Sequence, residues 1–548
     1  MKILLVAVNA KYIHSNLAVY SLRAAAQIYK EQVEIGEYTI NQQVDGILRD
    51  IYKKQPDMVA FSCYIWNRRI VDELLRELPK ILPKAVFWAG GPEVSYGSVD
   101  YLRSHPALTG VMRQEGEATF ARLAAHYIEG TGSLLEIPGI TYKDDGGEIH
   151  KTEAIKPLEM DELPFAYQDF QPFMHKIIYY ESSRGCPFGC SYCLSSVDRG
   201  VRYRSLSLVK EELGIFLAHQ VPQVKFVDRT FNVQPKRTKE LWQWLMEHDN
   251  FITNFHFEIA ADLLTEEEMQ LMSRMRPGLI QLEIGVQSTN AGTIQEIDRT
   301  MNLDKVKEHV KRIKSFGNIH QHLDLIAGLP GEDLESFRTS FDEVYAMEPQ
   351  QLQLGFLKVL QGTKMHQKVQ EYEIVYHASA PYEVLSTKWL TYEEILLLKG
   401  VEEMVEIYYN SGQFVKTIQE IQKRYDSPFD FYHALAVYYE DRGYDVISHS
   451  RMARYEILRE FLKAQGFWED VYDQCMVYDL YARENLKSRP AFAADLKKYK
   501  DRLKSYTERY GRQVHIEVFE RENGPIFVRF DYQRRNPMTM QAYVEVLD

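Results

Sequence analysis

Three of the five cysteines lie within eight residues, and this segment has the clearest chemical meaning in the chain. Cys186, Cys190 and Cys193 follow a Cys-x3-Cys-x2-Cys spacing directly after an apolar run. Thiolates are the usual ligands of iron–sulfur clusters. Three of them on one loop can bind three irons of a cubane and leave the fourth open for a chelating substrate. Two glycines and a proline in the segment let the backbone wrap closely, so the pattern predicts a metal site.

A structural zinc site is the main alternative for these cysteines. Zinc in such sites takes four protein ligands, and no fourth cysteine or suitable histidine is adjacent. A disulfide framework does not fit either, because the three cysteines are too close together; we expect a reducing compartment.

Apolar runs alternate with amphipathic stretches over residues 1–132, which is typical of a parallel sheet covered by helices. The expected strands are residues 2–8, 33–38, 58–62, 85–89 and 110–113. The expected helices are residues 17–29, 45–53, 69–81, 94–104 and 118–129. This pattern predicts a five-stranded, doubly wound α/β domain of flavodoxin-like (Rossmann-like) type. Its ligand crevice is expected at the carboxyl ends of the strands, in loops 9–16, 63–67, 90–95 and 114–117.

Turn signals in residues 133–175 predict a small hairpin and a linker. A second series of strands and helices then fills residues 176–375. Its expected strands are residues 177–182, 223–227, 254–259, 279–285, 320–326 and 351–356. Six such units predict a partial (β/α)6 barrel with its active site at the carboxyl ends of the strands.

Residues 376–548 change to long helical patterns, followed by a predicted terminal β hairpin. The expected helices include residues 392–409, 414–423, 451–464 and 491–506. The hairpin is expected over residues 514–532, with Asn523-Gly524 at its turn. No residue of this domain suggests a chemical role.

Composition narrows the class of partner. A net charge of −13 argues against a protein that binds nucleic acid over its whole surface, so nucleic acid is not expected as a partner. The N-terminal apolar run is too short for a signal-peptide core and is expected to form a strand. No stretch approaches the ~18 apolar residues of a membrane span. We therefore expect a cytoplasmic protein without a membrane partner.

The cysteine spacing after a strand resembles the signature of the radical S-adenosylmethionine (SAM) superfamily. The resemblance implies a [4Fe–4S] cluster on Cys186, Cys190 and Cys193, with Tyr192 beside the adenine of SAM. Residues at successive strand ends fit the same resemblance. The SAM contacts that it implies are Tyr192, Asp228, Glu258, Glu283, Gln287, Ser288, Asp324 and Gly328.

An α/β domain directly before such a core is similar to the cobalamin-binding radical SAM enzymes. Gly90-Gly91-Pro92-Glu93 and Glu115-Gly116-Glu117 carry this resemblance at the fourth and fifth strand ends. The cobalamin contacts that it implies are Asn9, His14, Ser15, Asn16, Ser62, Cys63, Tyr64, Trp66, Gly90, Gly91, Pro92, Glu93, Glu115, Gly116 and Glu117. Phe356-Leu357-Lys358 and Tyr382-Glu383 resemble a bacterial subgroup whose C-terminal helical domain has no assigned function.

One feature of many cobalamin proteins is absent from the sequence. No Asp-x-His-x-x-Gly segment, whose histidine ligates cobalt from below, occurs in the chain. His14 lacks the Asp and Gly at those spacings, so we expect cobalamin to bind without a protein histidine on cobalt. Cys63 is in the crevice region, although a buried free cysteine is usually a packing residue. Trp66 and its aromatic neighbour are placed to cover the lower corrin face.

The resemblance implies an enzyme that cleaves SAM reductively and methylates an unactivated carbon of an unknown substrate. An electron donor such as flavodoxin or ferredoxin is then needed. A non-methylating rearrangement or cyclisation is an alternative. A methylthiotransferase is less favoured, since it places three further cysteines in the N-terminal domain, where only Cys63 occurs. A cofactor-binding sensor would not require the SAM-contact segments. Because both cofactors would take part in one reaction, we also expect the crevice of the N-terminal domain to face the barrel mouth at Asp228, Glu283 and Asp324.

Overall fold

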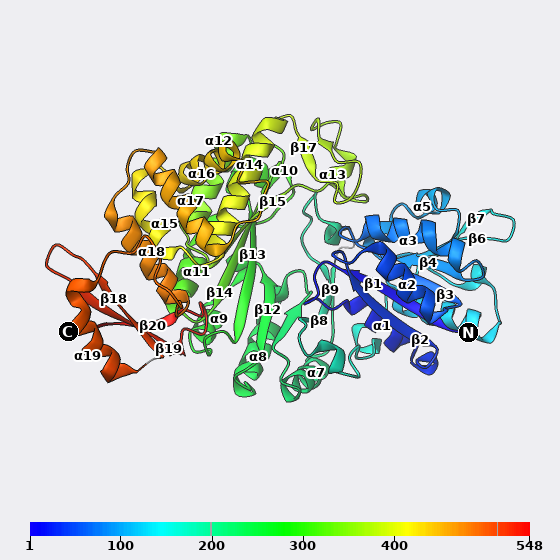
Figure 1. Cartoon of the computed structure of the whole chain (residues 1–548). Helices are drawn as coiled ribbons and strands as arrows, with labels where there is room; N and C mark the ends of the chain where they lie inside the picture. The colour runs from blue at the N-terminus through cyan, green and yellow to red at the C-terminus, as the bar shows by residue number, and fades with distance from the viewer. Residues whose placement is uncertain (198–199, 512, 548) are drawn as a thin grey trace. The chain divides into compact units, whose positions relative to one another are not determined.

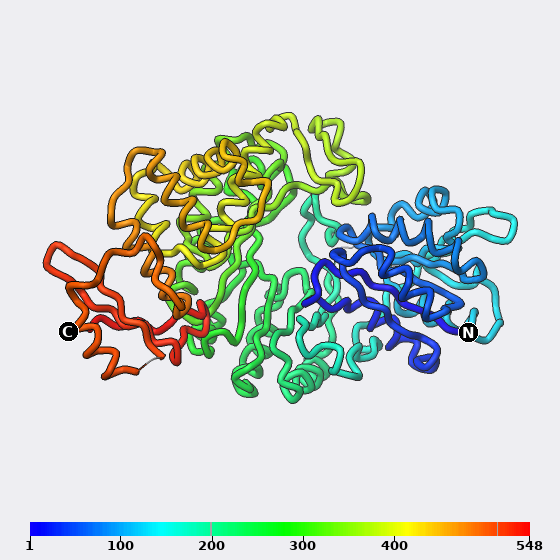
Figure 2. The backbone as a smooth tube through the Cα atoms, in the orientation of Figure 1, coloured from blue at the N-terminus to red at the C-terminus, as the bar shows by residue number. Residues whose placement is uncertain are grey.

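The computed structural model describes residues 1–197, 200–511 and 513–547 (Figure 1; Figure 2). The chain divides into two compact units. Unit 1 comprises Met1–Arg274, Gln295–Met301 and Phe356–Lys388. Unit 2 comprises Met275–Ile294, Asn302–Gly355 and Trp389–Asp548.

The N-terminal part of unit 1 is a seven-stranded sheet in the order β2-β1-β3-β4-β5-β6-β7. Five strands are parallel: β1 Ile3–Asn9, β2 Val33–Thr39, β3 Met58–Ser62, β4 Val86–Gly90 and β5 Leu108–Met112. Every residue of β1 and β3 is buried, as expected for central strands covered on both faces. The predicted doubly wound domain is confirmed.

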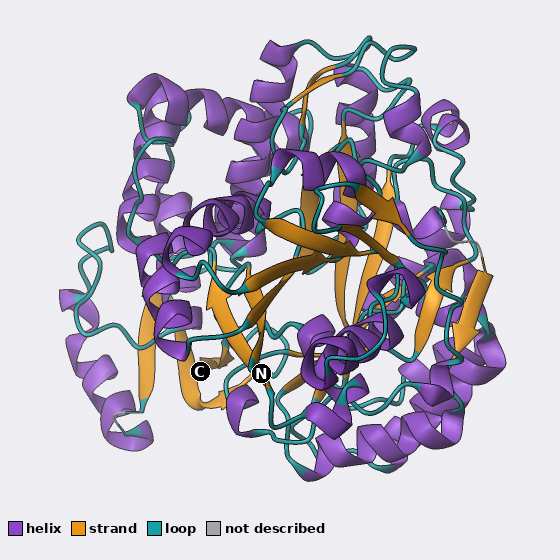
Figure 3. Ribbon diagram, turned by 90° about the vertical axis from the view of Figure 1, so that its right-hand side faces the viewer, coloured by secondary structure: helices purple, strands orange, loops and turns teal. Residues whose placement is uncertain are grey.

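Helices alternate with these strands (Figure 3). Their bounds are α1 Leu17–Ala25, α2 Val44–Lys54, α3 Arg68–Ile81, α4 Pro92–Ser95, α5 Ser98–Ser104 and α6 Glu117–Glu129. The prediction of a single helix over residues 94–104 is wrong, because helical structure is interrupted between α4 and α5. A Cβ on Gly97 would lie 2.6 Å from the Gln361 side chain, so a distant segment packs closely at the break.

The predicted hairpin is present, but it is part of the sheet rather than a separate element. β6 Ile140–Lys143 pairs antiparallel with β5, and β7 Ile149–Lys151 pairs with β6. The Arg113 guanidinium donates hydrogen bonds to the carbonyls of Ile140 and Thr152. These contacts hold the hairpin at the sheet edge.

The rest of unit 1 holds three parallel strands in the order β12-β11-β8 and an inserted hairpin. The strands are β8 Ile178–Tyr180, β11 Gln223–Phe226 and β12 Asn254–Ile259, and the helices are α7 Leu206–Ala218, α8 Pro235–Glu247 and α9 Glu266–Met272. The antiparallel pair β9 Ser183–Cys186 and β10 Gly200–Tyr203 was not predicted. A further segment carries α13 Lys364–Gln367, β16 Val375–Tyr376 and β17 Val384–Ser386.

The stretch of unit 2 before residue 356 holds the described strands β15-β14-β13, in this order in the sheet. These are β13 Ile280–Gln287, β14 His320–Ala327 and β15 Gln351–Phe356. The helices in this stretch of chain are α10 Ala291–Glu296, α11 Leu303–Phe316 and α12 Leu334–Tyr345. Burial alternates strictly along β13, so Glu283 and Gln287 share its less buried face. The six strands predicted for the barrel are all present at the expected places.

The C-terminal part of unit 2 packs six helices and a small antiparallel sheet. The helices are α14 Tyr392–Val405, α15 Val415–Ile421, α16 Pro428–Arg442, α17 Arg451–Ala464, α18 Asp470–Arg483 and α19 Lys500–Tyr510. The strands are β18 Val514–Phe519, β19 Ile526–Arg535 and β20 Ala542–Leu547. Among the described residues, no helix is long and apolar enough to cross a membrane.

Two predictions for this part need correction. The helix expected over residues 491–506 begins only at Lys500, because Phe492 and Ala493 pack without helical structure against an apolar cluster that includes Tyr481. The Asn-Gly hairpin is confirmed, with Gly524 at φ +106°, but β20 adds a third strand.

A buried carboxyl group makes the stability of unit 2 depend on pH. Asp479 of α18 accepts hydrogen bonds from the backbone amides of Lys416 and Thr417 and from the Thr417 hydroxyl, and so caps α15. Burial raises the pKa of Asp479 to about 7 despite these donors. A raised pKa gives stability that is fully present below the unfolded pKa and is lost as pH rises through the folded one.

We therefore expect Asp479→Asn to remove a pH dependence between about pH 4 and pH 7. The wild type should lose a few kcal/mol relative to this variant, since each pKa unit corresponds to about 1.4 kcal/mol. Urea denaturation midpoints across this range measure the effect. Asp501→Asn, on the exposed side of α19, is the matched control and should keep the wild-type profile. Parallel profiles for Asp479→Asn and wild type would contradict the assignment.

Candidate cofactor-binding site

The β9–β10 hairpin presents the three cysteines on one loop. Gly185 has φ +102°, and a Cβ there would lie 2.1 Å from the Gly200 carbonyl oxygen, so only glycine fits. Cys186 ends β9, opposite Gly200 in the register. Cys190 is buried and Cys193 is partly exposed. Burial raises the pKa of the Cys186 thiol. Three thiols on a closed loop fit an iron–sulfur cluster, and the described part of this loop offers no fourth ligand of a zinc site.

Groups from later in the chain hold this loop on two sides. The Arg299 guanidinium donates to the Cys190 sulfur at 3.6 Å and to the Tyr192 hydroxyl at 3.5 Å. The Ser191 amide donates to the Ile297 carbonyl, and the Ser191 carbonyl accepts from the Met365 amide, both at 2.9 Å. Sequence reasoning missed Arg299, because nothing in the sequence relates it to the cysteines.

Asp228, at the end of β11, has partners inside the protein. Its carboxylate accepts hydrogen bonds from the Ser182 amide at 2.8 Å, the Ser182 hydroxyl at 2.6 Å and the Ser183 hydroxyl at 2.7 Å. Only 1% of the residue is exposed, and burial raises its pKa to about 6. Asp228 thus orients the chain that enters the cysteine loop. Its expected contact with SAM stays a prediction, as does that of the half-buried Glu258.

Glu283, His322 and Asp324 come together in unit 2. One ligand atom of each lies within 4.8 Å of the others, and His322 Nε2 is 3.0 Å from Asp324 Oδ1. The β13–β14 register pairs Glu283 with His322, and Asp324 follows two residues later on the same face. Sequence reasoning named two of the three. The missed His322 could have been found from its i, i+2 spacing to Asp324.

The other predicted SAM contacts of unit 2 lie at turns. Gln287 has φ +72° beside a register shift in β13, and Gly328 has φ +87° after β14. Ser288 is fully buried and donates to Glu332 at 2.6 Å, and Ser340 donates to the same oxygen at 2.8 Å. Burial raises the pKa of Glu332 to about 7. The visible role of Ser288 is therefore to join the two strand ends.

The loops after β3 and β4 are those that the prediction assigns to the crevice of the N-terminal domain. Gly91 has φ +111°, and a Cβ there would lie 2.4 Å from the Cys63 carbonyl oxygen. Pro92 starts α4 directly after it. Tyr64 and Trp66 stack at 4.4 Å with an angle of 8° between their rings. Trp66 stays 43% exposed while its Nε1 donates to the Val8 carbonyl. These loops offer a flat aromatic surface beside closely approaching backbone.

Several predicted crevice residues serve the scaffold. Cys63 packs fully buried in the core of the sheet, and burial raises the pKa of its thiol to about 12, so only its backbone borders the crevice. Ser62 is buried, and its carbonyl accepts a hydrogen bond from the Asn67 side chain at 2.8 Å. The Cys63 amide donates to the Gly90 carbonyl at 2.7 Å.

The loop after β1 is likewise tied to the protein interior. Asn9 Nδ2 donates to the His14 carbonyl and to Glu37, and the Asn16 side chain caps α1. The Ser15 hydroxyl donates to the Ile177 carbonyl at 2.8 Å. His14 Nδ1 lies 2.8 Å from the Tyr179 hydroxyl, and burial lowers the pKa of His14.

The acidic residues predicted to contact cobalamin are ion-paired. Glu93 lies 3.4 Å from Arg68 and accepts a hydrogen bond from the Tyr382 hydroxyl. Glu115 and Glu117, on either side of Gly116, pair with arginines of the β9–β10 hairpin: Arg184 contacts both, and Arg202 contacts Glu115. Burial by itself raises the pKa of Glu117, but Arg184 outweighs it, and the pKa falls below its usual value.

Within unit 1, the crevice and the cysteine loop are neighbours. A parallel bridge joins His14 to Ile177, at the start of β8. Arg184, two residues before Cys186, binds the loop between β5 and α6. These contacts place the loops after β1 and β5 beside the chain that leads to the cysteines, and the expectation that the crevice faces Asp228 stays a prediction. The part that involves Glu283 and Asp324 belongs to unit 2 and stays a prediction.

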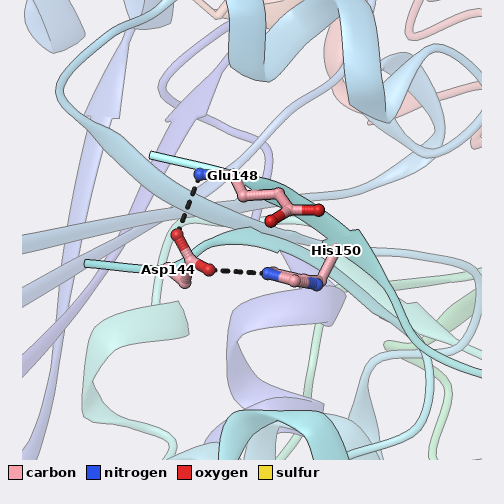
Figure 4. Close-up of side chains that lie close together, drawn as sticks. All are labelled: Asp144, Glu148 and His150. Atoms are coloured by element: carbon pink, nitrogen blue, oxygen red, sulfur yellow. Dashed lines mark hydrogen bonds and ion pairs between the residues drawn. The ribbon is translucent and has the colours of Figure 1, made fainter. Parts of the chain in front are cut away.

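A third group of side chains lies on the exposed β6–β7 hairpin (Figure 4). Asp144 accepts from the Glu148 amide at 2.8 Å and the Gly146 amide at 3.0 Å, and its other oxygen lies 2.8 Å from His150 Nε2. These contacts close the turn, which gives Asp144 a structural role.

Three protein families match successive parts of the chain. Residues 3–124 match the B12 binding domain, and residues 180–344 match the radical SAM superfamily. Residues 370–523 match a protein family of unknown function, DUF4080. The predicted combination of domains is confirmed, and with it the kinds of cofactor that such domains bind.

Individual relatives are distant. The cobalamin-dependent radical SAM methyltransferase TokK of Streptomyces tokunonensis is 25% identical over 345 residues, which cover 58% of this chain and 47% of that protein. The chain thus spans about half the length of that relative. Among solved structures, the cobalamin-dependent SAM radical enzyme OxsB has a TM-score of 0.59 at 15% identity, over 88% of this chain and 78% of that one. The radical SAM methyltransferase TsrM from Kitasatospora setae has a TM-score of 0.55 at 16% identity, over 68% and 76%. Both likenesses concern the fold.

We expect Cys186→Ala, Cys190→Ala and Cys193→Ala each to abolish cluster assembly, because each removes one of three protein ligands. Iron and sulfide analysis after anaerobic reconstitution measures this. Cys475→Ala, which changes a cysteine far along the chain, is the control and should retain the full iron content. A loop variant that keeps about four irons per chain would show that the ligands are assigned wrongly.

Proposed function

We propose, from the premise that this chain joins a B12-binding domain to a radical SAM domain, that it is a cobalamin-dependent radical SAM methyltransferase. It would cleave SAM reductively and methylate an unactivated carbon of its substrate. The observation that carries the proposal is the junction in unit 1. There the loop bearing Cys186, Cys190 and Cys193 is ion-paired to the loop that follows β5 of the B12-binding domain. The resemblance to TokK supports the choice of methyl transfer.

Different residues of the chain would bind the different cofactors. Cys186, Cys190 and Cys193 would hold a [4Fe–4S] cluster whose open iron binds SAM. The cluster with SAM supplies one-electron chemistry when bound, and cobalamin supplies methyl transfer. Arg299 places a positive charge against the Cys190 sulfur and orients the Tyr192 hydroxyl. A hydrogen bond to a ligating sulfur is one of the factors that set a cluster's reduction potential.

The crevice residues would orient a flat cofactor. Gly91 lets backbone approach closely, and the exposed face of Trp66, backed by Tyr64, gives an apolar surface of the right shape for a corrin ring. Tyr12 and Ile13 in the loop after β1 are also exposed, at 69% and 46%. Exposed apolar side chains at a strand-end crevice are typical of a ligand site.

The reaction would need an electron donor such as flavodoxin or ferredoxin, and a reducing compartment such as the cytoplasm. The substrate class is not part of the proposal.

A non-methylating cobalamin-dependent reaction is the second candidate. It is favoured by the fold likeness to OxsB, which extends over 88% of the chain, against 68% for TsrM. OxsB is a cobalamin-dependent SAM radical enzyme, a designation that does not specify methyl transfer. The two candidates differ in the fate of a second SAM molecule.

A product assay tests the proposal. After anaerobic reconstitution with cobalamin and a low-potential reductant, we expect both 5′-deoxyadenosine and S-adenosylhomocysteine. The first reports cleavage of SAM and the second reports use of its methyl group. Cys186→Ala should form no 5′-deoxyadenosine. If the wild type forms only 5′-deoxyadenosine, the non-methylating candidate replaces the first, and if it forms neither, both fail.

We also expect cobalamin to bind without a protein histidine on cobalt. His14 is the histidine of the predicted crevice, and its Nδ1 is engaged with Tyr179. Electron paramagnetic resonance of the Co(II) form should show no strong nitrogen splitting from a lower axial ligand. Nitrogen splitting that disappears in His14→Ala would refute this expectation.

A further inference from the structure

We propose that Arg184 is a positioning residue that fixes the cysteine loop against the cobalamin-binding domain. The sequence resemblance implies that Glu115 and Glu117 contact cobalamin, and the structure shows that both are ion-paired with Arg184. This inference rests on the proposed function, since it concerns the distance and orientation between two bound cofactors.

Arg184 contacts three carboxylates at once. Its Nη2 lies 2.8 Å from Glu117 Oε1 and its Nη1 lies 3.1 Å from Glu115 Oε2. Its Nε and Nη2 donate to Glu181 at 3.0 and 2.6 Å. The planar guanidinium makes such contacts in fixed directions, so the set fixes an angle as well as a distance.

A second arginine extends the network on the neighbouring strand. Arg202 lies directly opposite Arg184 in the β9–β10 register and pairs with Glu115. Its other nitrogen donates to the Leu158 carbonyl, in the segment after β7. Both strands of the hairpin are thereby tied to the loop between β5 and α6.

The ion pairs of Arg184 are largely shielded from solvent. The side chains of Arg184 and Glu117 are 20% and 9% exposed, so salt screens them less than a surface pair. Without Arg184, Glu115 would keep its contact with Arg202, whereas Glu117 and Glu181 would lose the guanidinium that they share. Their repulsion would drive the acidic loop and the hairpin apart.

A displacement of Arg184 would also displace the predicted cluster ligand Cys186. Gly185 alone separates Arg184 from Cys186, and the contact of Gly185 with Gly200 leaves no space for adjustment. On the other side, Arg184 binds Glu115 and Glu117 beside Gly116, in the segment that joins β5 to α6. The network therefore lies between the cysteine loop and that segment of the cobalamin-binding domain. Group transfer between two cofactors needs near-attack geometry, which such a network can maintain.

The test compares Arg184→Gln, Arg184→Lys, Glu117→Gln and the double variant Arg184→Gln/Glu117→Gln with wild type, each reconstituted with cluster and cobalamin. Iron and cobalt contents are measured first. The readout is the enhancement of Co(II) spin relaxation by the reduced cluster, together with the cobalamin dissociation constant. Lys54→Gln is the matched control. It removes an ion pair with Glu34, which lies at the amino end of β2, away from the hairpin and from the predicted crevice.

We expect Arg184→Gln and Glu117→Gln each to weaken the relaxation enhancement and to raise the cobalamin dissociation constant about tenfold, within the range of measured couplings in ion-pair networks. The double variant should be no worse than either single one, because both remove the same interaction. Arg184→Lys keeps the positive charge but loses the planar, bidentate guanidinium, so its effect should lie between those of Arg184→Gln and wild type. Lys54→Gln should match wild type.

Wild-type relaxation in a fully loaded Arg184→Gln protein overturns the inference, as do additive effects in the double variant. If Arg184→Gln fails to assemble, Glu117→Gln decides: weakened relaxation supports the inference and unchanged relaxation overturns it. A wild type that binds no cobalamin refutes the proposed function itself. A wild type that binds both cofactors but is insensitive to these variants refutes only the role of Arg184.

Discussion

Three thiols can share one cluster only if a short loop holds them at fixed separations, and much of unit 1 serves this constraint. The loop closes at Gly185, where the backbone of Gly200 leaves no room for a side chain. Asp228 fixes the chain that enters the loop through three hydrogen bonds, and the Ser191 backbone is bonded on both sides. Most of these contacts use backbone groups or buried side chains, which move little. Rigid support of this kind is what a preorganised metal site needs.

Parallel sheets explain why the remaining site residues meet. The carboxyl ends of parallel strands share one edge, so the loops after β1, β3, β4 and β5 lie along the same edge of the sheet, where doubly wound domains bind ligands. The bridge between His14 and Ile177 brings β8, which leads into the cysteine loop, to that same edge. In unit 2 the register of β13 and β14 likewise collects Glu283, His322 and Asp324. Topology thus gathers residues that are far apart in sequence.

Apolar periodicity was enough to predict the strands of both α/β domains to within about two residues, because buried parallel strands are continuous apolar runs. The β9–β10 hairpin, the break between α4 and α5, and β20 were missed, since distant contacts decide them. The cysteines could be identified from the sequence because their spacing is set by the requirement to bind one metal cluster. The roles of Ser288, Glu115 and Glu117 were harder to predict. A polar residue after a strand gives the same sequence pattern whether it binds a ligand or another side chain. Only the fold showed the partners Glu332 and Arg184.

The ion-pair network around Arg184 is better explained by orientation than by stability. Removing one partner of a buried ion pair destabilises a protein strongly, because the other charge is left buried without a partner. The net contribution of the intact pair to the free energy of folding is nevertheless often small, because desolvation offsets the Coulomb attraction. Apolar packing could hold the hairpin on the domain as strongly, but it would not select one angle. A guanidinium bound to Glu115, Glu117 and Glu181 does select one, through the directions of its N–H groups. In the proposed reaction two bound cofactors act together, so a fixed angle would be the more valuable property. This accounts for acidic residues beside the predicted crevice that pair with the β9–β10 hairpin.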